Sequence, residues 1–306
     1  MGIAIISPGR DVTKWKKNFQ RIDDSLQIQV YPDILDKESV EVVLLWHHPK
    51  GILSEFPNLK LICSMGAGVD HILSDPEIPD NIPIVRIVDD KLTFSMTNYT
   101  LMGILNYHRQ IVRYQVNQKK KLWDMSNPEI DIHVGVLGVG ALGGDVIAKL
   151  KFMDIPVSGY GKNPKSNVDY PYYHGDQLQE FLDHVNVIVC MLPLTKDTEN
   201  FLNIDFFKSC KKGTYLINVA RGNHLVEEDI LVALKEGYLS GALLDVFRKE
   251  PLPKDHPFWE NEDIMITPHI ASVTNPDAAA PQIIENYHRI KNRQPVINSI
   301  DRILGY

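Results

Sequence analysis

Short apolar runs alternate with amphipathic segments from the start of the chain. Five runs rich in β-branched residues are predicted strands, at residues 3–6, 28–31, 42–46, 59–63 and 84–88. Several of them are apolar without strict alternation, as expected when helices cover both faces of a sheet. Intervening segments such as 15–22 and 38–40 fill the gaps between these strands. The opening third of the chain is therefore predicted to be an α/β unit.

A second α/β series follows a long helical pattern. Apolar side chains recur at helical spacing from about residue 97 to residue 121, which predicts one long helix. Six further strands are predicted at 132–137, 155–160, 185–192, 214–219, 241–246 and 264–267. Strand–helix alternation of this kind indicates a parallel, doubly wound sheet.

The last part of the chain carries a helix-compatible stretch near 281–291 and has no partner in a six-stranded nucleotide-binding sheet. We expect it to pack on the first unit, which makes the first domain discontinuous. The predicted fold is α/β with two Rossmann-like or flavodoxin-like domains. Residues 1–96 plus 271–306 would form a substrate domain, and 97–270 a dinucleotide-binding domain. A chain of 306 residues has the length expected of two domains.

Charge and cysteine content exclude several classes of function. The formal net charge of −7 argues against a nucleic-acid-binding protein and against attachment to an anionic membrane surface. Cys63, Cys190 and Cys210 are widely spaced and in no metal-ligand pattern, which indicates reduced thiols in a reducing compartment. The His47-His48 pair lacks further ligands nearby, so we expect no metal site. Without a signal-like N-terminus or a membrane-length apolar run, the protein is expected to be cytoplasmic.

A glycine-rich segment directly follows a predicted strand and opens the helical stretch 145–152. In this context the pattern is typical of a turn that binds a dinucleotide, whereas a purely structural turn is the alternative. The first glycine allows a tight turn, the second lets the backbone approach a pyrophosphate, and the third permits close helix–strand packing. The N–H groups at the helix N-terminus would bind the phosphates. The predicted cofactor-binding residues here are Gly138, Gly140, Ala141, Leu142 and Gly143.

The end of the next strand bears on the choice of cofactor. An acidic residue about twenty positions after the glycines would bind the ribose 2′-hydroxyl of NAD. Gly161 stands near that place, and Lys162, Asn163 and Lys165 follow it. A glycine leaves room for a 2′-phosphate and two lysines can neutralise it, though without the bidentate fit of Arg. We therefore predict that NADP(H) is preferred, with NAD(H) as the alternative.

Three residues with matching chemistry follow later strands, at the sheet edge where open α/β folds bind ligands. Arg221 could hold a carboxylate and polarise a carbonyl, and His269 could protonate a nascent alkoxide. Glu250 could act on the histidine, because a nearby carboxylate favours protonated imidazole. Each residue alone has an ordinary structural explanation, but their joint placement favours reduction of a 2-keto acid. Further cofactor contacts are expected at strand ends, from Leu192, Pro193, Val219 and Ala220.

These segments resemble a known family. Ala-Arg-Gly at 220–222, Asp-Val-Phe at 245–247 and Thr-Pro-His at 267–269 resemble the signatures of the D-isomer-specific 2-hydroxyacid dehydrogenases. The resemblance runs from Trp46 to the terminal residues 301–306. It implies NAD(P)H-dependent reduction of a small 2-keto acid, such as glyoxylate or hydroxypyruvate, to the D-2-hydroxy acid. It also implies an active site in the cleft between two domains, and a homodimer formed through the nucleotide-binding domains.

The resemblance further implies individual roles. Arg221 would bind and polarise the substrate, His269 would donate the proton, and Glu250 would orient and charge that histidine. Asp245 would receive the nicotinamide amide, and Trp46 would wall the substrate pocket, although a strand-end core aromatic is the simpler explanation of Trp46. Backbone N–H groups would help to hold the substrate carboxylate at Ala67, Gly68 and Val69; a plain tight turn is the alternative there.

Two positions depart from the family pattern. Asn275 stands where similar proteins tend to carry Arg, which bears on the substrate, and Asn98 replaces an acidic residue, which bears on packing. Two alternative functions stay open: a related dehydrogenase for phosphoglycerate, formate or a bulkier D-hydroxy acid, and a non-catalytic nucleotide-sensing module. The catalytic set is complete and the sequence shows no peptide-docking segment, so catalysis is favoured. The pocket residues alone do not rank the substrates.

Overall fold

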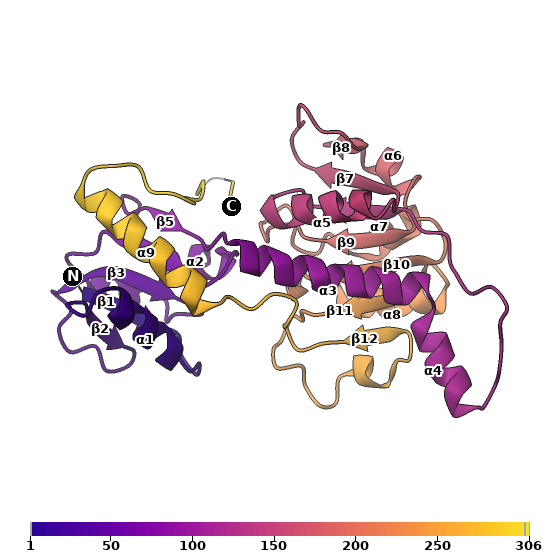
Figure 1. The fold of residues 1–306 in the computed structure, drawn as a ribbon, viewed down its shortest axis with the longest axis horizontal. Coiled ribbons are helices and arrows are strands. Elements are labelled where there is room, and N and C mark those ends of the chain that lie inside the picture. The colour runs from indigo at the N-terminus through magenta and orange to yellow at the C-terminus, as the bar shows by residue number, and fades with distance from the viewer. Residues whose placement is uncertain (1, 303, 306) are drawn as a thin grey trace. The chain divides into compact units, whose positions relative to one another are not determined.

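The computed structural model describes residues 2–302 and 304–305. Met1, Ile303 and Tyr306 lie outside the described residues, and the last two belong to the terminal segment that contributes to the family resemblance. The chain divides into two compact units (Figure 1). Unit 1 consists of Met1–Leu92 and Val273–Tyr306, and unit 2 of Thr93–Ser272.

Unit 1 is built on a five-stranded sheet in which neighbouring strands are parallel, as predicted. Its strands are β1 (Gly2–Ile6), β2 (Gln27–Val30), β3 (Val40–Leu45), β4 (Leu61–Ser64) and β5 (Ile84–Val85). The order across the sheet is β2-β1-β3-β4-β5, so the chain reverses its winding direction between β1 and β3. Ligands of doubly wound sheets bind outside the carboxyl ends of strands at such a switch point.

Of the helices that the structure describes in unit 1, the first and the last lie in segments predicted to be helical, and the two short ones between them were not predicted. They are α1 (Thr13–Ile22), η1 (Ile52–Glu55), α2 (Asp70–Leu73) and α9 (Pro276–Lys291), and α1 packs against α9. Helix α9 starts before the predicted residue 281, because the Asn275 side chain caps it by accepting the N–H of Asp277 at 3.0 Å. Segment 38–40, which the sequence placed between two strands, is a turn that leads into β3.

Unit 2 is built on a parallel sheet of seven strands, one more than predicted. The strands are β6 (Val134–Leu137), β7 (Val157–Gly161), β8 (Tyr172–His174), β9 (Val187–Cys190), β10 (Thr214–Asn218), β11 (Leu239–Leu244) and β12 (Ile264–Ile266). The order is β12-β11-β10-β9-β6-β7-β8. Strand β8 was missed because it is a half-buried edge strand of three residues without an apolar run.

The central strands of unit 2 are buried on both faces. In β9, Val187 and Val189 belong to the apolar cluster that includes residues of α3 (Asp90–His108) and α5 (Ala141–Phe152), whereas Ile188 and Cys190 belong to the cluster on the other face. The remaining helices of this unit are α5 (Ala141–Phe152), α6 (Leu178–Leu182), α7 (Ile204–Ser209), η2 (Gly222–His224), α8 (Glu227–Lys235) and η3 (Pro257–Glu260). This double burial explains why the strands are continuous apolar runs.

The helix predicted at 97–121 is instead two helices, α3 (Asp90–His108) and α4 (Ile111–Lys119). Helix α3 begins earlier because the Asp89 carboxylate accepts the N–H groups of Lys91 and Leu92, both at 2.9 Å. It ends because Gln110 takes a left-handed conformation with φ of 52°, which a right-handed helix cannot continue. Among the described residues, no helix is both long and apolar enough to cross a membrane.

Candidate active site

The glycine turn lies at the switch point of the unit 2 sheet, between β6 and β9. Gly138 has φ of 94°, and a Cβ there would lie 2.6 Å from the carbonyl oxygen of Met191. A Cβ on Gly143 would lie 2.2 Å from the carbonyl oxygen of Gly138, so the packing requires both glycines. A Cβ on Gly140 would meet open space among the described residues. Gly140 is also the N-cap of α5, and it therefore leaves the helix N-terminus accessible to an anion.

The segment after β7 lies beside this turn in a way that the sequence did not show. The ammonium group of Lys165 donates to the carbonyl oxygen of Val139, inside the glycine turn. Lys162 forms an ion pair of 2.8 Å with Asp197. A Cβ on Gly161 would lie 2.5 Å from the Tyr172 hydroxyl, so this glycine makes room for Tyr172 rather than only for a ligand.

Arg221 lies at the carboxyl end of β10, where it is the N-cap of η2. Its backbone N–H donates to Nδ1 of His224 at 3.2 Å, and its carbonyl accepts from the Asn218 amide at 3.1 Å. A Cβ on Gly222 would lie 1.9 Å from the carbonyl carbon of Phe247. This close approach brings the loop of Arg221 against the loop that carries Glu250.

Glu250 and His269 follow the adjacent parallel strands β11 and β12. Nδ1 of His269 lies 2.7 Å from Oε2 of Glu250, and the backbone N–H of Phe247 donates to Oε1 at 3.0 Å. Burial alone would raise the pKa of Glu250, but these hydrogen bonds and the charges of His269 and Arg221 outweigh it and lower that pKa. Because the two side chains remain 36% and 29% exposed, an ionised Glu250 can hold an imidazole that a substrate can reach.

Asp245 holds the loop that carries His269. Its Oδ1 accepts from the Thr267 hydroxyl at 2.6 Å and from the Ile270 N–H at 2.8 Å, and its Oδ2 accepts from the Ala271 N–H at 2.8 Å. Asp245 is buried among these bonds, and the contact with a nicotinamide amide stays a prediction. His269 itself has φ of 55° and donates its N–H to the Asp245 carbonyl at 2.8 Å.

Sequence reasoning missed two members of this network. The Thr267 hydroxyl gives its proton to Asp245, so the Tyr99 hydroxyl must donate to Thr267. Burial raises the pKa of Tyr99, which keeps it a donor at neutral pH. The Thr-Pro-His motif contained a signal for Thr267, but nothing in the sequence pointed from Tyr99 in α3 to this loop.

The other predicted cofactor contacts of unit 2 lie at strand ends. Leu192 and Pro193 follow β9, and the Pro193 carbonyl accepts from the Thr198 hydroxyl at 2.6 Å. Val219 and Ala220 follow β10 and are buried. The sheet thus brings these residues to the same edge as the glycine turn, since all its strands run parallel.

In unit 1, Trp46 follows β3 and is half-buried, with its ring centroid 4.7 Å from that of His71. A Cβ on Gly66 would lie 3.2 Å from the Trp46 ring. The loop from Gly66 to Val69 follows β4, and the Ser64 hydroxyl holds it by donating to the Gly68 carbonyl at 2.7 Å. The structure therefore places Trp46 against Gly66, which precedes the residues predicted to hold a carboxylate, Ala67, Gly68 and Val69.

The two departures from the family pattern have different surroundings. Asn275 serves as the cap of α9, and it also accepts a hydrogen bond of 3.5 Å from Lys14. Asn98 is exposed on α3, so the expected effect on packing finds no support.

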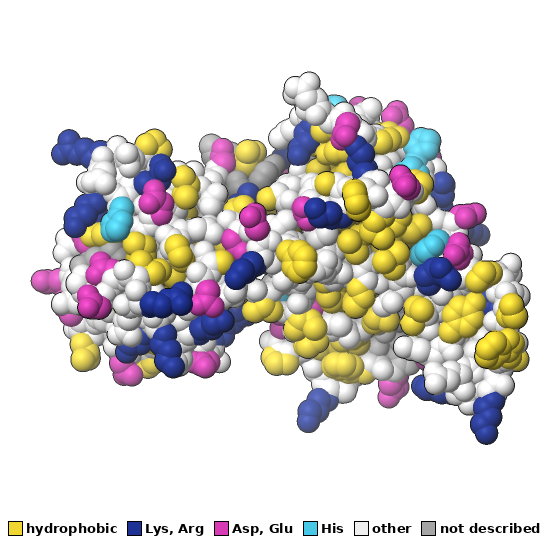
Figure 2. Space-filling model, in the orientation of Figure 1, with side chains coloured by type: hydrophobic (Ala, Val, Ile, Leu, Met, Phe, Trp, Pro, Cys, Tyr) yellow, Lys and Arg dark blue, Asp and Glu magenta, His cyan; other side chains and the backbone are white. Residues whose placement is uncertain are grey.

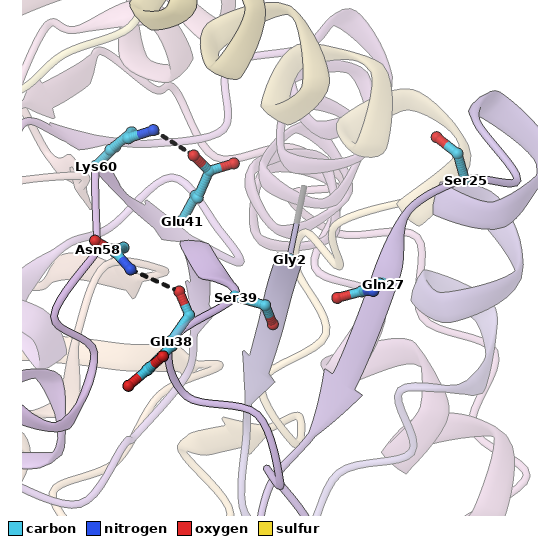
Figure 3. A pocket seen from close by; sticks show the side chains of 8 residues that line it. All are labelled: Gly2, Ser25, Gln27, Glu38, Ser39, Glu41, Asn58 and Lys60. Atoms are coloured by element: carbon cyan, nitrogen blue, oxygen red, sulfur yellow. Dashed lines mark hydrogen bonds and ion pairs between the residues drawn. The ribbon is translucent and has the colours of Figure 1, made fainter.

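A polar hollow lies at the opposite edge of the unit 1 sheet, by the amino ends of its strands (Figure 3). It is lined by Gly2, Ser25, Gln27, Glu38, Ser39, Glu41, Asn58 and Lys60. Figure 3 shows Lys60 pointing toward Glu41, with which it forms an ion pair. The hollow is remote from the carboxyl ends of these strands, and we assign it no part in the site.

Metal-binding and thiol chemistry find no support in the described residues. Among residues 2–302 and 304–305, no group of three or more His, Cys, Asp or Glu side chains could hold a metal ion. Cys63, Cys190 and Cys210 are buried, unpaired thiols. Burial raises the pKa of Cys190 and of Cys210 to about 12, so the thiolate form is negligible at neutral pH.

Together these features define an oxidoreductase that binds a dinucleotide, and comparison with known proteins identifies the family. Residues 101–271 match the family described as D-isomer specific 2-hydroxyacid dehydrogenase, NAD binding domain. The chain is 36% identical to glyoxylate/hydroxypyruvate reductase A of Photorhabdus laumondii, with 100% of both chains covered. The chain therefore belongs to the D-isomer specific 2-hydroxyacid dehydrogenases, and the family predicted from its motifs is confirmed. Its members are NAD(P)-dependent oxidoreductases.

Two solved structures are similar over the whole chain. One is a D-isomer specific 2-hydroxyacid dehydrogenase from Xanthobacter autotrophicus in complex with NADPH and MES, with a TM-score of 0.94 and 33% identity over 100% of this chain and 99% of that one. The other is an NADPH-dependent glyoxylate/hydroxypyruvate reductase from Sinorhizobium meliloti in complex with NADP and sulfate, with a TM-score of 0.93 and 30% identity at the same coverage.

Proposed function

We propose that the protein reduces a small 2-keto acid, glyoxylate or hydroxypyruvate, to the D-2-hydroxy acid, with NADPH as the preferred cofactor. The observation that carries the proposal is the 2.7 Å contact between His269 and Glu250 on the sheet edge that also bears Arg221 and the glycine turn. The names of the similar proteins support the same substrates.

The side chains divide the reaction between them. When bound, the reduced nicotinamide supplies the hydride. Arg221 binds the substrate carboxylate and polarises the carbonyl, and protonated His269 gives its proton to the carbonyl oxygen. Glu250 holds the imidazole through Nδ1, and Nε2 would be the atom that gives the proton to the substrate. General acid catalysis of this kind accelerates a reaction by about 10²–10⁴-fold.

Lys165 is the residue that we propose as the main contact of the 2′-phosphate. Its bond to the Val139 carbonyl keeps its charge beside the glycine turn, whereas Lys162 is engaged by Asp197. Lys162 and Asn163 would flank the phosphate. The solved relatives named with NADPH or NADP support this preference.

Unit 1 would serve as the substrate domain and unit 2 as the dinucleotide-binding domain. In unit 1, the backbone N–H groups of Ala67, Gly68 and Val69 would help to hold the substrate carboxylate, and Trp46 would wall the pocket. The contact between Trp46 and Gly66 supports this assignment, because it fixes the ring against the start of that loop.

A homodimer in the cytoplasm is part of the proposal. Figure 2 shows hydrophobic side chains gathered over α4. The exposed apolar residues of α4 and the loop after it are Ile111, Val112, Val116, Leu122, Trp123 and Met125, of which Trp123 is 91% exposed. A surface of this kind is typical of an interface between subunits. Three unpaired thiols are in keeping with a reducing compartment.

A panel of 2-keto acids assayed with NADPH and with NADH tests the proposal. We expect NADPH-linked turnover of glyoxylate and hydroxypyruvate to exceed that of phenylpyruvate. In Lys165→Met, the preference for NADPH over NADH should fall by about tenfold, as for the loss of one charge-assisted hydrogen bond, while the exposed control Lys212→Met keeps it. Equal kcat/KM with both cofactors would remove the NADP assignment. Cofactor binding without turnover of any substrate would favour the nucleotide-sensing module.

A further inference from the structure

His224 is a fully buried histidine that the proposed mechanism does not use. It is the last residue of η2, three positions after Arg221, and its exposed fraction is 0%. Its loop is bonded to the segment before α7, because the N–H groups of Asn200 and Leu202 donate to the carbonyls of Asn223 and His224, both at 2.9 Å. A polar ring removed from water in this way needs hydrogen-bond partners inside the protein.

The first partner of the His224 ring is the backbone of Arg221. The Arg221 N–H donates to Nδ1 of His224 at 3.2 Å, and the His224 N–H donates to the Arg221 carbonyl at 3.2 Å. A side chain at the third helical position that accepts the N–H of the N-cap is one half of a capping box, in which glutamate or glutamine usually takes this part. The ring therefore fixes the backbone from which the Arg221 side chain extends.

The second partner is the segment that follows β9. Nε2 of His224 lies 3.3 Å from the carbonyl oxygen of Pro193, which is a predicted cofactor contact and also accepts the Thr198 hydroxyl. A neutral imidazole has one N–H and one acceptor nitrogen. With the proton on Nε2, the ring accepts from the Arg221 N–H and donates to Pro193 at the same time. The His224 ring thus joins two strand-end segments of the proposed site.

The opposite tautomer fits these partners less well. The Arg221 carbonyl oxygen lies 3.1 Å from Nδ1 of His224, so a proton on Nδ1 could be donated to it. The Arg221 N–H would then lose its acceptor, and the bare Nε2 would face the Pro193 oxygen. An acceptor against an acceptor and a buried N–H without its partner are both unfavourable, so the contacts select the tautomer with the proton on Nε2.

We propose that His224 is a positioning residue for Arg221. Through Nδ1 it fixes the Arg221 backbone, and through Nε2 it ties that backbone to the cofactor-binding segment at Pro193. Small displacements of a catalytic group lower the rate even when their cause lies away from the chemistry. This inference rests on the proposed function, because it takes Arg221 as the residue that binds the substrate.

Two substitutions of His224 test the proposal. His224→Leu has neither an acceptor nor a donor, and it should lower kcat/KM for glyoxylate about tenfold, the effect of leaving one buried N–H unpaired. His224→Gln supplies the usual capping-box acceptor and should restore most of that loss. The control His184→Leu makes the same replacement at an exposed position of unit 2 and should match the wild type. If His224→Leu retained the wild-type kcat/KM, the proposal would be overturned.

A double-mutant cycle with Arg221→Met separates positioning from a purely structural role. In the Arg221→Met background, His224→Leu should change the residual kcat/KM little, because no guanidinium is left to position. An equal tenfold loss in both backgrounds would mean that His224 supports only the fold, and it would overturn the proposal.

A measurement on the wild type keeps the proposal testable even if His224→Leu does not fold. Nitrogen-15 NMR of the histidine side chains should show His224 with a protonated Nε2 and an unprotonated Nδ1. The opposite tautomer would overturn the proposal, because Nδ1 could not then accept the Arg221 N–H. Failure of the proposed function is distinguishable from these results, because the wild type would then reduce neither glyoxylate nor hydroxypyruvate.

Discussion

Glu250→Gln is the substitution that most sharply tests how the proton donor is held. The carboxylate uses one oxygen for His269 at 2.7 Å and the other for the Phe247 N–H at 3.0 Å. Glutamine has the same shape but only one acceptor oxygen. Whichever way the amide is turned, one of the two contacts loses its acceptor, and the negative charge beside the imidazole is gone.

The size of the effect follows from these contacts. A hydrogen bond to a charged group contributes about 1.5–3 kcal/mol, which corresponds to about 10- to 100-fold in rate. Because the Glu250 side chain is 36% exposed, solvent screening moves the expected loss of kcat toward the lower end, about 10- to 30-fold. The KM for the substrate should change less, since Glu250 acts through His269.

The assay is NADPH oxidation followed with saturating glyoxylate, together with a titration of NADPH binding. The control is Glu262→Gln, which makes the same charge change at an exposed position of the same unit. We expect the control to match the wild type and both variants to bind NADPH normally. If Glu250→Gln retained the wild-type kcat, the carboxylate would not support the proton donor and the reasoning would fail.

Three further predictions concern the scaffold. Gly143→Ala would place a methyl group 2.2 Å from the carbonyl oxygen of Gly138, and it should lower the free energy of unfolding, measured in urea, by about 1–3 kcal/mol. The control Gly140→Ala should leave the free energy of unfolding unchanged and raise only the Kd for NADPH. Thr267→Val removes the hydroxyl bonded to Asp245 and should lower both kcat and the free energy of unfolding, the latter by about 1–3 kcal/mol, with Thr267→Ser restoring both. The buried Asp75 carboxylate of unit 1 contacts Nε2 of His48 at 3.1 Å and accepts the N–H groups of Gly51 and Glu77, both at 3.0 Å. Burial would raise the pKa of Asp75, but these hydrogen bonds lower it below the ordinary value of 3.8. The stability that Asp75 contributes is therefore present above that pH and is lost as the pH falls through its lowered pKa. The difference in unfolding free energy between the wild type and Asp75→Asn, measured by urea unfolding at a series of pH values, should therefore become smaller as the pH falls. A difference that did not change with pH would show that the Asp75 carboxylate does not stabilise the fold in its ionised form.

The strand pattern was readable from the sequence because both sheets are parallel and covered on both faces. Strands buried in this way must be apolar at nearly every position, and the runs stand out. Strand β8 was not predicted, since an edge strand of three polar and aromatic residues is only half-buried and has no apolar run. The break after α3 was also not predicted. Gln110 adopts the left-handed conformation that ends the helix, whereas a glycine or asparagine at this position would have indicated such a break in the sequence.

The chemistry of the site was readable where it depends on strand ends. Glu250 and His269 follow neighbouring strands, so a parallel sheet necessarily brings their loops together. Contacts between distant segments left no local signal. The hydroxyl of Tyr99 reaches Thr267 from a helix, and Lys165 reaches Val139 across the turn. Gly161 was interpreted as space for a phosphate, but its neighbour is the Tyr172 hydroxyl, from a strand that the pattern did not reveal.

The role of His269 as the proton donor is tested most directly by a single-turnover measurement. NADPH bound to the wild type or to His269→Gln is mixed with excess glyoxylate, and the nicotinamide absorbance is followed. The variant should bind NADPH with the wild-type Kd and oxidise it about 10²–10⁴-fold more slowly. Oxidation at the wild-type rate by His269→Gln would contradict the proposed mechanism.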